Sequence, residues 1–138
     1  MSFETAIQTT IYTALKADAP LSAVVVDVYD DVPQPTDTGD SSDFPYVTIG
    51  ETVHSDWDTV TSVGDDATLT IHTWSRFAGR SEVKEIQGLI YDVLHLANLT
   101  LVGYNSVGLM WESSQSFLDA DGKTRHGVQV FRFIISDL

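Results

Sequence analysis

The sequence contains no cysteine among its 138 residues. A disulfide framework, a thiol nucleophile and a thiolate zinc site are therefore all excluded. A domain of this length buries roughly 68–70% of the surface that its unfolded chain exposes, so its core needs no covalent or metal support. The absence of cysteine fits a reducing compartment, and we expect one single domain over residues 1–138.

Long apolar runs are also missing. No stretch approaches the ~20 consecutive apolar residues that a membrane helix requires. Residues 1–19 have neither a basic segment nor a continuous apolar core, so no signal peptide is expected. We therefore expect a soluble protein that has no membrane partner and stays where it is made.

Positive charge is scarce, above all in the first half of the chain. The formal net charge is −13; residues 1–66 hold 13 acids and one base, Lys16, whereas residues 67–138 hold 7 acids and 6 bases. Such a surface repels phosphate backbones, so the basic footprint of a nucleic-acid binder is absent. The acids either keep the protein soluble or prevent a polyanion from adhering to it.

Sequence patterns of catalytic and cofactor sites are absent as well. Walker, Rossmann and Gly-x-Ser-x-Gly motifs do not occur. No histidine has another histidine two, three or four residues further on, so no local metal-ligand pair exists. Residues 119–122 resemble the start of a calcium loop, but Lys123 follows and Val128 stands where the closing glutamate is expected. We predict no catalytic residue, no cofactor, no metal and no enzymatic activity.

Two segments show the apolar spacing of amphipathic helices. Phe3, Ile7, Ile11 and Leu15 recur every four residues and predict a helix near 3–17, with Ser2 as its cap and Pro20 at its end. A second stripe predicts a helix near 81–97, capped by Ser81 and stopped by Asn98. Its members are Val83, Ile86, Ile90, Val93, Leu94 and Ala97.

Five other segments are typical of strands: 23–32, 45–53, 67–76, 107–116 and 127–136. Within residues 67–76 the side chains alternate, with Leu69, Ile71 and Thr73 on one side and Thr70, His72, Trp74 and Arg76 on the other. The Asp-Gly pair in residues 119–122 predicts a hairpin turn. Residues 33–43 are expected to form a loop, and residues 54–66 a loop or a projecting hairpin.

Together these elements predict an α+β fold: a single domain with a largely antiparallel sheet and two helices packed on one face. The expected core residues are Ile7, Ile11, Leu15, Leu69, Ile71, Ile86, Ile90 and Leu94.

The three tryptophans are candidates for core or interface positions. Trp74 and Trp111 lie in predicted strands and should be core or half-buried. Trp57 lies in a polar stretch between Asp56 and Asp58. We expect it to be exposed and to contact another subunit, because tryptophan often anchors interfaces.

The order and spacing of several segments resemble a known family. VYDDVPQ at 28–34 and FPYVTIGE at 44–51 are followed by DWDT at 56–59, LTIHTWSRFAGR at 69–80, EIQGLIYDVLH at 85–95 and DGKTRHGVQVFRF at 121–133. From Ser2 to about Ile135 the chain resembles the phage tail completion, or tail terminator, family, formerly a domain of unknown function. The acidic loop at residues 35–43 is the least familiar part.

The resemblance implies a structural protein of the virion, assembled in the cytoplasm of a bacterial host. Family members in long-tailed phages and gene transfer agents form a homohexameric ring on the head-proximal end of the tail tube. The ring stops tube polymerisation and offers the surface that docks to the head. The implied partners are other copies of the chain, the tail tube protein and the head connector or stopper protein, while DNA passes through the lumen without specific binding.

Two alternatives remain open. One is another head–tail joining protein, such as a stopper. The other is a small ligand-binding α+β domain, which would present a concave pocket with convergent polar groups.

The ring hypothesis assigns candidate roles to two sets of residues. Closed rings use heterologous contacts, in which one surface of a subunit meets a different surface of the next. Expected interface residues are Trp57, Asp121, Lys123 and Arg125. Expected lumen acids are Asp37, Asp40, Asp43, Asp56 and Asp58, which would otherwise lie on the outer rim and serve solubility.

Overall fold

The computed structural model describes residues 3–29, 44–61, 63–97, 99, 101 and 103–137. The helices are α1 (Phe3–Ala17), α2 (Ala19–Val24) and α3 (Ser81–Leu94), and the strands are β1 (Asp27–Tyr29), β2 (Tyr46–Asp56), β3 (Gly64–Ser75), β4 (Tyr104–Leu118) and β5 (Arg125–Asp137). The strands form one sheet in the order β1-β2-β3-β5-β4. Strands β1 and β2 pair in parallel, and the other described pairs are antiparallel. The predicted α+β fold with a largely antiparallel sheet is confirmed.

The central strands β3 and β5 each have one buried and one half-buried face. Leu69, Ile71 and Thr73 are buried, whereas His72 and Trp74 between them are half-buried, as the alternation predicts. Strand β5 repeats this pattern, because its register with β3 places residues of like burial opposite each other. The buried face of β5 carries Gln129, Phe131, Phe133 and Ile135.

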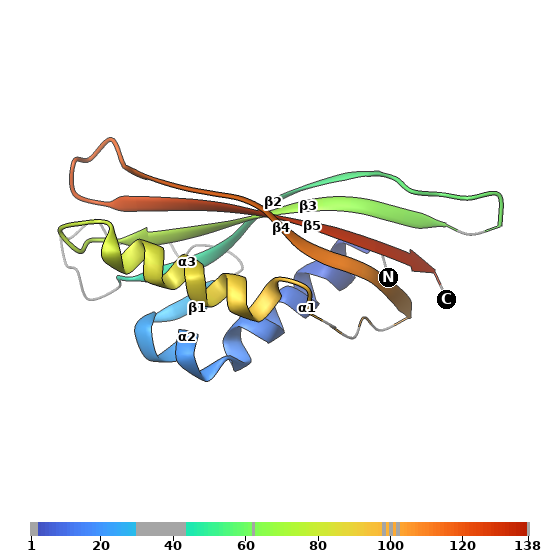
Figure 1. The fold of residues 1–138 in the computed structure, drawn as a ribbon, viewed down its shortest axis with the longest axis horizontal. Helices are drawn as coiled ribbons and strands as arrows, with labels where there is room; N and C mark the ends of the chain where they lie inside the picture. The colour runs from blue at the N-terminus through green and yellow to red at the C-terminus, as the bar shows by residue number, and fades with distance from the viewer. Residues whose placement is uncertain are drawn as a thin grey trace.

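Helices α1 and α3 cover the buried face of the sheet, and the opposite face carries no helix (Figure 1). The apolar stripe of α1 and that of α3 turn toward this face and join one core. Each of the eight predicted core residues has 0% exposure. The predicted arrangement, with helices on one face, is therefore confirmed. None of the described helices is long and apolar enough to cross a membrane.

Residues 19–24 correct the predicted strand at 23–32. They form the short helix α2, whose N-cap Asp18 accepts a hydrogen bond from the Leu21 amide at 3.0 Å. Pro20 lies in the first turn of α2, where a backbone N–H has no partner within the helix, so the missing N–H of proline breaks no hydrogen bond. The residue that was expected only to end α1 therefore also begins α2. Residues 23 and 24 are therefore helical, and the described part of the predicted strand contains β1 at Asp27–Tyr29.

Helix α3 differs from the prediction at both ends. Ser81 is its first residue, and Arg80 takes the N-cap position without a side-chain hydrogen bond. The helix ends at Leu94, because the Leu96 amide leaves the helix to donate to the Leu109 carbonyl at 2.8 Å. The predicted caps Ser2 and Asn98 lie outside the described residues, as do residues 30–43 with the predicted acidic loop.

The two antiparallel hairpins have their tips at opposite ends of the sheet (Figure 1). Of the two forms expected for residues 54–66, a loop or a projecting hairpin, the structure shows the hairpin, since β2 and β3 pair as far as Asp56 and Asp65. The other tip follows the predicted turn between β4 and β5. Both tips are therefore available for contacts outside the subunit.

We predict that Ile90→Ala lowers the free energy of unfolding by about 2–5 kcal/mol, because it leaves a cavity between α3 and the sheet. Lys84→Ala, at an exposed position of the same helix, should change it by less than about 0.5 kcal/mol. Urea unfolding followed by circular dichroism measures both values. Equal effects of the two substitutions would contradict the placement of α3.

Candidate assembly surfaces

The tip of the β2–β3 hairpin exposes several apolar side chains. Trp57 is 39% exposed, Val63 50%, and Val60 is fully exposed at 104%. We call Trp57, Val60 and Val63 together the apolar tip. Exposed apolar side chains grouped on one projecting loop mark a contact site more strongly than scattered ones. The predicted exposure of Trp57 is confirmed.

Hydrogen bonds within the loop hold the apolar tip in one conformation. The Asp58 carboxylate accepts from the Gly64 amide at 2.8 Å, and the Asp56 carboxylate accepts from the Asp58 amide at 2.9 Å. The Trp57 ring lies against Gly64, where an added Cβ would come within 2.8 Å of the ring. Asp56 and Asp58 remain exposed, so these two proposed lumen acids also order the loop.

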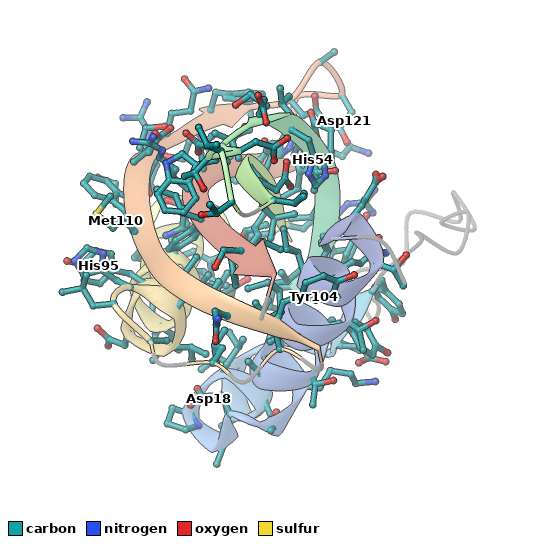
Figure 2. The ribbon with its side chains drawn as sticks, turned by 90° about the vertical axis from the view of Figure 1, so that its right-hand side faces the viewer. Asp18, His54, His95, Tyr104, Met110 and Asp121 are labelled. Atoms are coloured by element: carbon teal, nitrogen blue, oxygen red, sulfur yellow. The ribbon has the colours of Figure 1, made fainter. Side chains whose placement is uncertain are left out.

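The tip of the β4–β5 hairpin is polar and is organised by Asp121, which lies at the end of this hairpin (Figure 2). Its carboxylate accepts from the amides of Lys123 and Thr124, both at 2.8 Å, and from the Thr124 hydroxyl at 2.6 Å. These bonds, the hydroxyl first, lower the pKa of Asp121 to about 2. Lys123 is exposed and Arg125 is half-buried at the start of β5.

An aromatic row crosses the helix-free face of the sheet, with one ring from each strand. It consists of Tyr29, Tyr46, Trp74, His126 and Phe117. Successive ring centroids lie 5.7, 6.2, 3.8 and 4.9 Å apart. Such cross-strand pairs stabilise a sheet and fix its register.

Two histidines that are far apart in sequence meet beside this row. His72 Nδ1 lies 2.7 Å from His126 Nε2, and His72 Nε2 lies 2.7 Å from a Glu51 carboxylate oxygen. Burial, and then the charge of His72, lower the pKa of His126, while the hydrogen bond to His72 lowers that of Glu51. Sequence reasoning missed this cluster because only strand register brings residues 72 and 126 together.

Metal binding gains no support from this cluster. In the part of the chain that the structure describes, no group of three or more His, Cys, Asp or Glu side chains could hold a metal ion. His54, on β2, instead pairs with Asp65 across the hairpin.

Trp111 departs from its predicted burial, whereas Trp74 is half-buried as expected. Trp111 is 40% exposed because β4 is an edge strand whose pairing with β5 shifts between Trp111 and Ser113. Its indole donates to the Ser114 hydroxyl at 2.7 Å, and its ring meets that of Tyr91 edge-on, with centroids 5.9 Å apart. The Trp111 amide donates to His95 Nδ1 at 3.1 Å. Met110, which precedes Trp111 in β4, lies on the same side of the molecule as His95 (Figure 2).

The predicted site residues are therefore divided among separate places. Trp57, Asp56 and Asp58 lie together at the apolar tip, and Asp121, Lys123 and Arg125 lie at the opposite end of the sheet (Figure 1). Asp37, Asp40 and Asp43 lie outside the described residues.

The lowered pKa of His126 predicts an acid-sensitive stability. In the unfolded chain His126 has its ordinary pKa of about 6.5 and binds a proton below that pH. In the folded chain its pKa is lower, so between the two pKa values the unfolded chain binds more protons. This contribution therefore makes the free energy of unfolding fall as the pH drops from about 6.5 toward the folded pKa, with no effect above that window. His126→Phe keeps an aromatic ring in the row and should show a shallower decline in urea titrations at several pH values. Parallel curves for the variant and the parent would refute this assignment.

Comparison with known proteins confirms the resemblance to tail completion proteins. A family model described as tail completion protein gp17 matches residues 9–136. Tail completion protein gp17 of Bacillus phage SPP1 is 29% identical over 99 residues, which cover 72% of this chain and 73% of that protein.

Two solved structures share the fold over most of the chain. A chain in the virion of a native gene transfer agent particle matches with a TM-score of 0.86 and 28% identity, covering 98% of this chain and 99% of that one. The structure of bacteriophage SPP1 gp17 matches with a TM-score of 0.60 and 26% identity, covering 94% of this chain and 88% of that one. The chain therefore belongs to the tail completion protein gp17 family, whose members are structural proteins of phage-type tails.

Proposed function

We propose that this chain forms a ring, a homohexamer, that caps the head-proximal end of the tail tube, stops tube polymerisation and provides the surface that docks to the head. The observation that carries the ring is the difference between the two ends of the sheet. One end presents the apolar tip with Asp56 and Asp58, and the other presents a polar turn with Lys123 and Arg125. Unlike surfaces at opposite ends suit the heterologous contacts of a closed ring.

The comparison with an assembled particle supports this role. The fold of this chain matches, almost end to end, a chain that is part of a gene transfer agent virion. Pre-organised hairpin tips also favour assembly, because little conformational entropy is lost when they are buried.

A ring at this position would let DNA pass through its lumen, and acids on the lumen wall would keep the DNA from adhering. Repulsion acts over only about 8 Å at physiological salt, so only acids at the lumen surface contribute. The exposed Asp56 and Asp58 are candidates, together with Asp37, Asp40 and Asp43.

The mass of the chain in solution, with and without the tail tube protein, tests this proposal. A ring that binds the tube protein is expected. Binding to the head connector alone would favour a stopper, and a monomer that binds neither would favour a small ligand-binding domain.

Trp57→Ala and Arg125→Glu should leave the subunit folded while weakening ring formation or tail completion. The first substitution removes an exposed aromatic side chain from one tip, and the second reverses the charge of a side chain near the opposite tip. Circular dichroism checks the fold, and particle yield with electron microscopy of tails checks function. Val26→Ala, at a position 53% exposed near β1, is the matched control. Normal yields from both interface variants would remove these residues from the interface.

Replacement of Asp56 and Asp58 by lysine should create DNA binding that weakens steeply with salt, and should slow genome ejection without altering tail length. Replacement of both by asparagine is the matched control, because asparagine keeps the side-chain acceptors that order the loop while removing the charge. A lysine variant at residues 37, 40 and 43 tests the second cluster. Unchanged DNA binding and ejection in both lysine variants would exclude a lumen role.

A further inference from the structure

A hollow of about 260 Å³ lies between α3 and the edge strand β4. Lys84, Gly88 and Tyr91 line it from α3, and Trp111 and Gln129 line it from the sheet. We call it the α3–β4 groove. Both aromatic side chains of the groove are exposed, Tyr91 at 37% and Trp111 at 40%.

We propose that the α3–β4 groove receives the apolar tip of the β2–β3 hairpin from a neighbouring copy of the chain. This inference rests on the proposed ring and names the two surfaces that would join its subunits. The groove and the tip are different surfaces, so each copy would offer its tip to one neighbour and its groove to the other. Contacts of this kind close into a ring without leaving a free surface of either sort.

Shape favours this occupant. Gly88 is exposed on α3, and a Cβ added there would meet no atom within 4 Å, so the groove stays open above the aromatic walls. Val60, at the end of a narrow loop, is fully exposed at 104% and has a branched apolar side chain that can pack on the exposed surface of the two touching rings. Burial of these apolar surfaces supplies the driving force, at about 25 cal/mol per Å² removed from water.

Hydrogen bonding favours the same occupant. Gln129 is buried, and its amide nitrogen donates to the Gln87 carbonyl at 2.9 Å, while its Oε1 has no partner among the described residues. A buried acceptor without a partner costs about 1–3 kcal/mol, so a donor that reaches this oxygen when the groove side chains rearrange on docking is favoured. The apolar tip brings such a donor, since Trp57 carries an indole N–H on a large apolar ring.

Charge is also complementary. The β2–β3 hairpin, residues 46–75, contains five acids and no lysine or arginine. Lys84 lines the groove and would meet a hairpin that carries no positive side chain. Opposite charges at the edge of an apolar contact steer the partners into register and weaken with added salt.

The arrangement of the elements permits the contact. The apolar tip lies at one end of the sheet, beyond the helices, whereas α3 runs beneath the other half (Figure 1). A subunit therefore cannot place its own tip in its own groove, and the contact must be made with another copy.

Engineered cysteines test the proposal directly, because the full chain has none of its own. We expect the double variant Val60→Cys, Gly88→Cys to form intermolecular disulfides on mild oxidation, giving a ladder of multimers that ends at the ring. An equal mixture of the two single variants should give disulfide-linked dimers and no larger species, because each subunit then carries one cysteine, in its tip or in its groove. Val60→Cys combined with Ser22→Cys, an exposed position on α2, is the control and should give no ladder.

A second variant separates the contact from the thiol chemistry. Gly88→Leu fills the groove and raises helix propensity, so the subunit should fold while its self-association weakens at least tenfold. Val60→Glu should have the same effect from the other side, as measured by sedimentation with the tail tube protein present. If the parent chain forms rings while Gly88→Leu and Val60→Glu do so equally well, or if the cysteine ladder is missing, this inference fails and the ring stands. If the parent chain forms no ring alone or with the tube protein, the proposed function fails as well.

Discussion

The burial of one face of the sheet beneath α1 and α3 is the interaction on which the rest of the structure depends. Strands β3 and β5 place their large apolar side chains on that face, and the helix stripes complete the core with fully buried residues such as Ile11 and Ile90. Because the helices cover only this face, the other face must be stabilised by its own side chains. The aromatic row and the Arg132–Asp66 ion pair do so across the strands.

The helices are shorter than the hairpins, so they leave the two hairpin tips uncovered, and these tips are the candidate assembly surfaces. Both hairpin tips lie at the ends of the sheet, where side chains such as Val60 have no core to enter. Their loops are nevertheless ordered by carboxylates that accept backbone amides, Asp58 at one tip and Asp121 at the other. Rigid tips with unlike chemistry suit a subunit that must bind different partners at its two ends.

The candidate site was predictable only in part. Trp57 between two aspartates was correctly expected to be exposed, because nothing near it in sequence could bury it. Trp111 was expected to be core or half-buried, yet it is exposed in the α3–β4 groove because β4 is an edge strand with a shifted register. The His72–His126 contact was not foreseen, since strand alternation assigns each residue to a face without saying which residue lies opposite.

The sequence by itself determined the fold class, the two main helices, the faces of β3 and all eight predicted core residues, because apolar spacing with periods of 3.6 and 2 specifies which side of an element is buried. Only the tertiary structure decided the strand order and the end of α3. These depend on pairings between distant residues, such as the Leu96 amide with the Leu109 carbonyl, whose energies local spacing does not encode. The groove beside Trp111 belongs to this second group, because it exists only where α3 lies along an unpaired edge of the sheet.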